Sequence, residues 1–185
     1  MDAPTLRRRV RALVAFFVAA LVLSGLTAIP LQWEAGLLER LAGPASALGG
    51  RWPALAEWVA RIRQGLDATG RDYPFVLYGT DWLAFAHFVI AVAFWGVWKD
   101  PVRNRWVIEF GLIACALIIP AALIFGQLRG IPFFWRLLDC SFGVGGFLPL
   151  WITRRYILRL EALERAAGAA PPAPAAGAAP PAAPG

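Results

Sequence analysis

The chain has 185 residues, of which 59% are hydrophobic and only 16% are charged, and its mean hydropathy is +0.58. These values lie outside the range of an ordinary soluble domain and indicate a membrane protein. A formal net charge of +6 could indicate a nucleic-acid-binding protein, but the positions of the charged residues argue against that class.

Four apolar segments are each long enough to cross a bilayer as a helix, which takes about 20 residues. They cover residues 12–31, 81–98, 106–128 and 132–153. The sequence therefore predicts an all-α integral membrane protein with four transmembrane helices. Because short connections force antiparallel neighbours, we expect the last three spans to form a bundle in sequence order. The position of the first span stays open.

The first span follows a basic N-terminus, residues 1–11, and this arrangement also resembles a secretory signal peptide. However, Ala12–Pro30 contains no charge and is longer than a usual signal core. Cleavage after Ala28 would place Leu26 at a position where a signal-peptide cleavage site requires a small residue. We therefore expect an uncleaved anchor.

Residues 32–80 should lie outside the cytoplasm and contain one amphipathic helix. Pro53 suits a helix start, apolar residues then recur every three or four positions, and Gly70 ends the pattern. We expect a helix over 53–68 that caps the bundle, although its apolar side could instead lie on the membrane surface.

The basic residues cluster beside the ends of the predicted spans. The clusters are Arg7, Arg8, Arg9 and Arg11; Lys99, Arg103 and Arg105; and Arg154, Arg155, Arg159 and Arg165. With four spans, all three clusters share one side of the membrane, and the positive-inside bias makes that side the cytoplasm. The cytoplasmic side then holds both termini, the loop 99–105 and a basic helix end at 154–165. We expect the basic residues to contact anionic lipid rather than nucleic acid.

The tail, residues 166–185, contains only Ala, Gly and Pro, and we expect it to be disordered. Such a tail, together with many Arg and few Lys, is typical of GC-rich bacteria. The predicted location is therefore a bacterial inner membrane.

Two ionisable residues fall at a similar depth inside predicted spans. His87 lies about 9 Å below the outer end of the second span, at Asp81, and Asp139 about 10 Å below the outer end of the fourth. Small residues lie on the same helix face as each of them. These are Ala84 and Ala91 beside His87, and Gly143 and Gly146 beside Asp139. We expect His87 and Asp139 to meet across a helix interface, as a proton-linked pair or as a structural hydrogen bond.

Other polar residues offer alternative contacts. Arg136, three residues before Asp139, could satisfy its carboxylate instead. On the third span, Glu109 and Gln127 lie at opposite ends of one face, and Glu109 is expected to pair with Arg105, or with Arg103 or Arg155.

No motif of a known chemistry occurs in the chain. A single His cannot build a usual zinc site or a bis-histidine haem, so we expect no metal and no cofactor. The favoured function is that of a non-enzymatic accessory, scaffold or regulatory subunit, which assembles with itself or with a membrane-protein partner. The alternative is a proton- or solute-handling protein or membrane enzyme that uses His87, Asp139 and Glu109, with Arg136 and Asp81 at the outer mouth.

Overall fold

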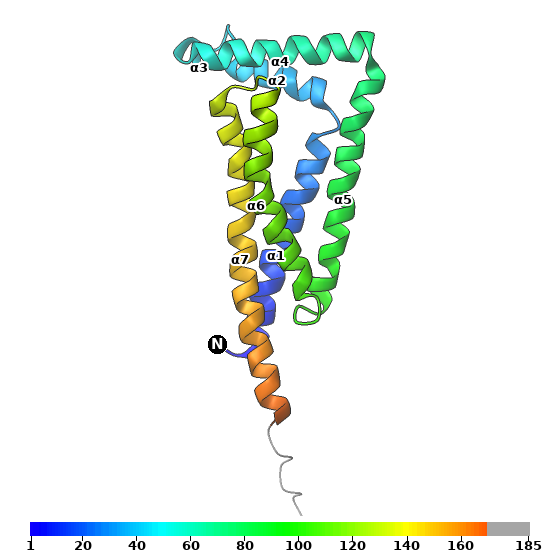
Figure 1. Cartoon of the computed structure of the whole chain (residues 1–185), viewed down its shortest axis with the longest axis vertical. Coiled ribbons are helices and arrows are strands. Elements are labelled where there is room, and N and C mark those ends of the chain that lie inside the picture. The colour runs from blue at the N-terminus through cyan, green and yellow to red at the C-terminus, as the bar shows by residue number, and fades with distance from the viewer. Residues whose placement is uncertain (170–185) are drawn as a thin grey trace, which may run out of the picture.

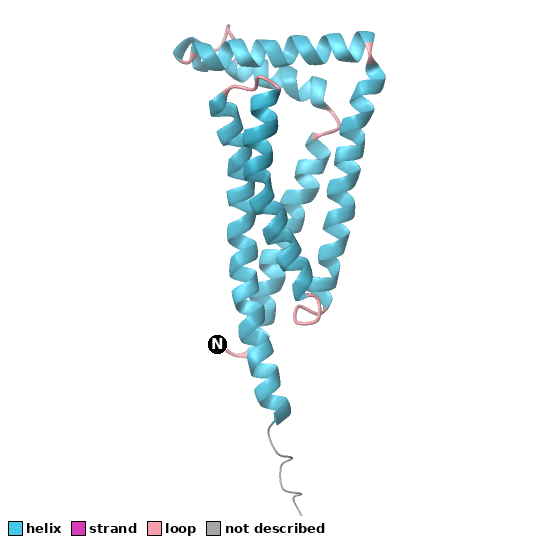
Figure 2. Ribbon diagram, in the orientation of Figure 1, coloured by secondary structure: helices cyan, strands magenta, loops and turns pink. Residues whose placement is uncertain are grey.

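The fold is seen in a computed structural model that describes residues 1–169. All regular secondary structure in this part of the chain is helical, and short loops join the helices (Figure 2). The elements are α1 (Ala3–Thr27), α2 (Leu31–Ala42), α3 (Ala47–Arg51), α4 (Pro53–Asp72), the 3₁₀-helix η1 (Pro74–Leu77), α5 (Tyr78–Lys99), α6 (Arg105–Leu128) and α7 (Phe133–Ala169).

Four of these helices, α1, α5, α6 and α7, run along the long axis of the molecule, and α4 lies across one end (Figure 1). Three helical segments are long and apolar enough to cross a membrane, namely Ala3–Thr27, Pro74–Lys99 and Arg105–Leu128. This supports the prediction of a helical membrane protein. The predicted fourth span, 132–153, is not among them, since the first part of α7 carries Arg136 and Asp139 and is less apolar.

The exposed surfaces of the long helices are consistent with a lipid environment. Large apolar side chains such as Phe16, Val92 and Ile113 are exposed on α1, α5 and α6, and 72% of the Val92 surface is accessible. Apolar patches of this extent are not typical of a protein surrounded by water.

Helix order differs from the predicted bundle in one respect. α1 packs against both α5 and α7, and α6 packs chiefly against α7, whereas α5 contacts α6 only sparsely. Figure 1 shows α5 and α6 close together at the loop that joins them and far apart at the other end. The prediction that the last three spans pack in sequence order is therefore confirmed for α6 and α7 but not for α5 and α6, since α5 packs mainly against α1, whose place the sequence left open.

The core lies toward the end of the bundle that holds the loop between α5 and α6. Its buried members are Val10, Val14, Phe94, Val97, Val107, Ile108, Cys115, Leu150 and Ile157. The rings of Phe17 and Phe94 pack across the α1–α5 interface with their centroids 4.8 Å apart and their planes tilted by 41°. This core therefore joins α1, α5, α6 and α7 into one unit.

The opposite end is covered by α2, α3 and α4. α4 begins at Pro53 as the sequence predicts, but it continues past Gly70 to Asp72. Its Trp58 contacts Trp135 of α7 with ring centroids 6.3 Å apart, and Trp52 contacts Phe134 at 5.0 Å. These contacts join α4 to the start of α7, as the capping interpretation requires.

α7 is one continuous helix that extends beyond the predicted span into the predicted tail. Residues 166–169 are helical, because alanine favours helix and the first proline of the tail comes only at Pro171. The remainder of the predicted disordered tail lies outside the described residues.

Candidate functional site

The structure does not bring His87 and Asp139 together. His87 lies on α5 where that helix meets α1, and a Cβ atom on Gly25 of α1 would come within 2.9 Å of the His87 Cβ. The His87 Nδ1 is 2.7 Å from the carbonyl oxygen of Leu83, one turn earlier on the same helix. Asp139 lies on α7, half-buried, and α1 packs between these two helices. The similar depth predicted from the sequence therefore does not make the two residues neighbours.

Arg136 does not pair with Asp139 either. Its Nη1 donates to the carbonyl oxygen of Leu123 on α6 at 3.3 Å, and its guanidinium lies 5.3 Å from the centre of the Phe133 ring. The aliphatic part of the side chain lies against Gly126, where a Cβ atom would come within 2.6 Å of the Arg136 Cγ and Cδ. Gly126 thus makes room for Arg136 where the C-terminal end of α6 meets the start of α7.

Glu109 belongs to a network of ion pairs at the other end of α6 and α7. Arg105 is 3.3 Å from Glu109, as expected, and Arg154 of α7 is also 3.3 Å away, in place of Arg103 or Arg155. Arg105 also binds Glu161 at 2.8 Å. The network therefore joins α6 to α7.

Glu161 is held by two arginines. It accepts a hydrogen bond from Arg165, one turn later on α7, and another from Arg105. The hydrogen bond from Arg165, assisted by both positive charges, lowers the pKa of Glu161 below its usual value of 4.5. A further ion pair, Arg7 to Glu164 at 2.5 Å, joins the start of α1 to α7.

The remaining predicted polar residues lie apart from this network. Asp81 lines a groove of about 260 Å³ between the α1–α2 turn and the start of α5. Gln127 is exposed at the C-terminal end of α6. Thus no single site collects Asp81, His87, Glu109, Gln127, Arg136 and Asp139.

The predicted small-residue positions lie at helix interfaces. Ala84 and Ala91 are buried on α5, and the Ala84 backbone approaches Gly25 of α1. A Cβ atom on Gly143 would come within 2.6 Å of the carbonyl oxygen of Cys115 on α6, and one on Gly146 within 2.8 Å of the Cys115 Sγ. The glycines therefore allow α6 and α7 to approach closely.

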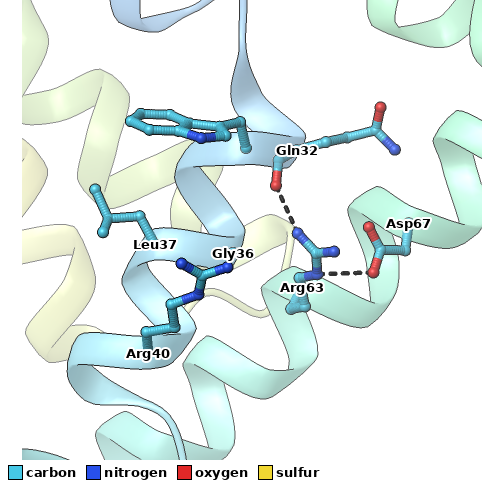
Figure 3. Close-up of a pocket in the computed structure, with 7 residues that line it drawn as sticks. Gln32, Gly36, Leu37, Arg40, Arg63 and Asp67 are labelled. Atoms are coloured by element: carbon cyan, nitrogen blue, oxygen red, sulfur yellow. Dashed lines mark hydrogen bonds and ion pairs between the residues drawn. The ribbon is translucent and has the colours of Figure 1, made fainter.

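A pocket that the sequence analysis missed lies between α2 and α4 (Figure 3). It has a volume of about 400 Å³ and is lined by Gln32, Trp33, Gly36, Leu37, Arg40, Arg63 and Asp67. Arg63 of α4 donates through Nη1 to the backbone oxygen of Gln32 at 2.6 Å, and its Nε is 2.7 Å from the Asp67 carboxylate. Arg63 is thus fixed in place by contacts to both helices.

Two glycines allow the helices of this pocket to come together. A Cβ atom on Gly36 would lie 2.9 Å from the Arg63 Nη1, and one on Gly70 would collide with the side-chain amide of Gln32. Trp33, Gly36, Leu37 and Arg40 recur at helical spacing, which was the one signal in the sequence that these residues share a face. The other wall comes from α4, about 30 residues away, and no local pattern indicates that pairing.

Among residues 1–169, no three His, Cys, Asp or Glu side chains are grouped so that they could hold a metal ion. No family model, curated protein or solved structure matches the chain. The function must therefore be argued from the geometry alone.

Proposed function

We propose that this chain is a four-span protein of a bacterial inner membrane that acts as a non-enzymatic accessory, scaffold or regulatory subunit. Both termini lie in the cytoplasm, and the protein binds an apolar transmembrane helix of a membrane partner. Three arguments support this proposal.

The first argument concerns the fourth span. Only residues 129–132 separate α6 from α7, and the two helices pack side by side. Gly143 of α7 lies against Cys115 and Ile118, in the middle of α6. A helix that contacts the middle of a transmembrane helix must share the same layer of the bilayer. We therefore assign the first part of α7, residues 132–153, to the membrane as well.

The second argument concerns orientation. The cluster Arg7–Arg11 lies in the first turns of α1, Arg103 lies in the α5–α6 loop and Arg105 begins α6, and Arg154–Arg165 lie in the last part of α7. Ion pairs between Arg105 and Glu161 and between Arg7 and Glu164 link all of these regions. An excess of arginine on one side favours placement of that side in the cytoplasm.

The third argument, which carries the functional part of the proposal, is an apolar groove between α1 and α5. The groove has a volume of about 670 Å³. It is lined by Val14, Ala15, Val18, Ala19 and Val22 of α1 and by Phe88, Ala91, Val92, Phe94, Trp95 and Trp98 of α5. Small side chains on one wall and large aromatic ones on the other suit the close approach of another helix, since packing drives helix association in lipid.

The alternative function, proton or solute handling, depends on an intramembrane site shared by His87 and Asp139. The nearest polar contact of His87 is instead a carbonyl of its own helix, and α1 lies between α5 and α7.

The proposal can be tested by photocrosslinking in intact cells. A photoreactive phenylalanine analogue at Ala19, which lines the groove, is expected to yield one discrete protein adduct. The same analogue at Ala20, which is also exposed but does not line the groove, serves as the matched control and should yield none. The partner is then identified by mass spectrometry, and an analogue in its crosslinked helix should label this chain in return. Lipid adducts alone at both positions, or equal protein adducts at both, would contradict a partner in the groove.

A further inference from the structure

We propose that the pocket between α2 and α4 binds an anionic phosphate group, of the kind carried by a phospholipid head group or a free phosphate ion. This inference rests on the proposed topology, which puts α2 and α4 at the extracytoplasmic surface of the membrane. It does not depend on the partner proposed for the α1–α5 groove.

Two guanidinium groups supply the donors. Arg63 uses its Nε and one Nη1 hydrogen for Asp67 and Gln32, which leaves its Nη2 group available. Arg40 is exposed, and no salt bridge among the described residues involves it. In Figure 3 the Arg40 side chain extends alongside α2 toward Gly36, on the face that borders the pocket. Planar guanidinium groups match the geometry of phosphate oxygens and bind them with paired hydrogen bonds.

The carboxylate in the pocket does not prevent anion binding. Asp67 is the only acidic residue among those that line it, and its oxygen lies 2.7 Å from the Arg63 Nε. The Arg63 Nε also lies 3.9 Å from the carboxylate of Glu39, so Arg63 is shared between two carboxylates and offsets the charge of Asp67 only in part. The guanidinium of Arg40, which forms no salt bridge among the described residues, therefore supplies the main attraction for an anion. A volume of about 400 Å³ lies within the range of known small-ligand sites.

The surroundings of the pocket favour a lipid as the source of the phosphate. α2 begins at Leu31, only four residues after α1 ends at Thr27, so its first turn lies at the edge of the bilayer. Trp33, Leu37 and Leu41 recur every four residues and are exposed, with 68% of the Trp33 surface accessible. An exposed apolar stripe on a helix beside a transmembrane segment lies against the lipid interface. Trp33 and Leu37 also line the pocket, so the glycerol and acyl parts of a phospholipid would lie beside them.

The test uses the full-length protein purified in a maltoside detergent, which contains no phosphate. In one arm, phosphatidylglycerol is titrated and bound lipid is counted by native mass spectrometry. In the other arm, inorganic phosphate is titrated in a calorimeter. The variant is Arg40→Gln, which removes the free guanidinium from an exposed position, and the matched control is Arg61→Gln, an exposed arginine of α4 that does not line the pocket.

We expect one phosphatidylglycerol to bind, with an affinity that Arg40→Gln lowers about tenfold and that Arg61→Gln leaves unchanged. A second outcome is that inorganic phosphate binds, with an affinity that depends on Arg40, and phosphatidylglycerol does not bind. This result would support the phosphate site and identify a free ion as its ligand. Binding of neither ligand, or equal binding by the two variants, would overturn the proposal. Because the pocket lies outside the α1–α5 groove, failure of crosslinking at Ala19 leaves this result unaffected.

Discussion

Gly143 of α7 lies directly against the backbone of Cys115 in α6. A Cβ atom at position 143 would come within 2.6 Å of the Cys115 carbonyl oxygen and 3.3 Å of the Ile118 Cβ. The obstacle is backbone rather than a flexible side chain, so the two helices must separate to admit even one methyl group. The contact therefore sets how closely α6 and α7 pack.

Gly143→Ala is predicted to destabilise the protein. Overpacking usually costs about 1–3 kcal/mol, and the better helix propensity of alanine offsets up to about 1 kcal/mol of that cost. Gly145→Ala is the matched control, because a Cβ atom at that neighbouring position has no heavy atom within 4 Å. Thermal melting of both variants in detergent checks the prediction. A melting temperature for Gly143→Ala at or above that of Gly145→Ala would show that α6 and α7 are not packed this closely.

His87→Ala and Asp139→Asn are predicted to act independently. Because α1 packs between α5 and α7, the effect of the double variant on stability should equal the sum of the single effects to within about 0.5 kcal/mol. A double-mutant cycle on the free energy of unfolding provides the measurement. A coupling well above that value would mean that the two side chains interact directly or through water, and would restore the paired site expected from the sequence.

Glu161→Gln is predicted to lower the melting temperature at pH 7 but not in acid. The arginines hold the pKa of Glu161 below 4.5, its usual value, so the ionised group stabilises the folded state above that pH. This stabilisation is lost as the pH falls through the lowered pKa, because the carboxylate is then protonated in both states. Melting curves of parent and variant should therefore approach each other as the pH falls from 4.5 and converge once it is below the lowered pKa of Glu161.

Glu57→Gln provides the control for this pH series. Glu57 is exposed on α4 and takes part in none of the salt bridges found within residues 1–169. Its removal should leave the pH dependence unchanged. The same pH profile for both variants would mean that the effect of Glu161→Gln reflects net charge rather than the contacts to Arg105 and Arg165.

Trp58→Ala is predicted to loosen the cap without unfolding the bundle. The ring contact between Trp58 and Trp135 should contribute about 0.5–1.5 kcal/mol beyond its buried area. Hydrogen exchange should then become faster in α2, α3 and α4 and remain unchanged in the core around Phe94 and Ile108. Trp106→Ala, an exposed tryptophan at the opposite end of the molecule, should leave exchange in the cap unaffected. Equal exchange in the two variants would show that Trp58 does not hold the cap.

Much of the secondary structure could be predicted because long apolar runs and helix boundaries are local features. Long apolar stretches predicted the helices α1, α5 and α6, and Pro53 predicted the start of α4. The pairing of Glu109 with Arg105 follows from their spacing of four residues on one helix. Each of these predictions needed only residues that are close together in the chain.

The predictions that failed needed the order of helices in space. Depth along a span can be estimated by counting residues, which is how the sequence predicted a similar depth for His87 and Asp139. Their separation depends on α1, whose position relative to α5 and α7 has no local signal. The pocket between α2 and α4 was missed for the same reason, since its two walls come from different helices of the cap.

The central claim, four spans with both termini in the cytoplasm, is tested most directly by labelling single cysteines from outside. Cys115 and Cys140 are both buried, so new cysteines at the exposed positions Ala45, Arg103 and Ala162 can be probed with an impermeant maleimide on intact spheroplasts. On intact spheroplasts, only Ala45→Cys should be labelled. Arg103→Cys and Ala162→Cys should be labelled only after the membrane is permeabilised. Labelling of Ala162→Cys on intact spheroplasts, with Arg103→Cys protected, would show that α7 does not return across the membrane and would contradict the account.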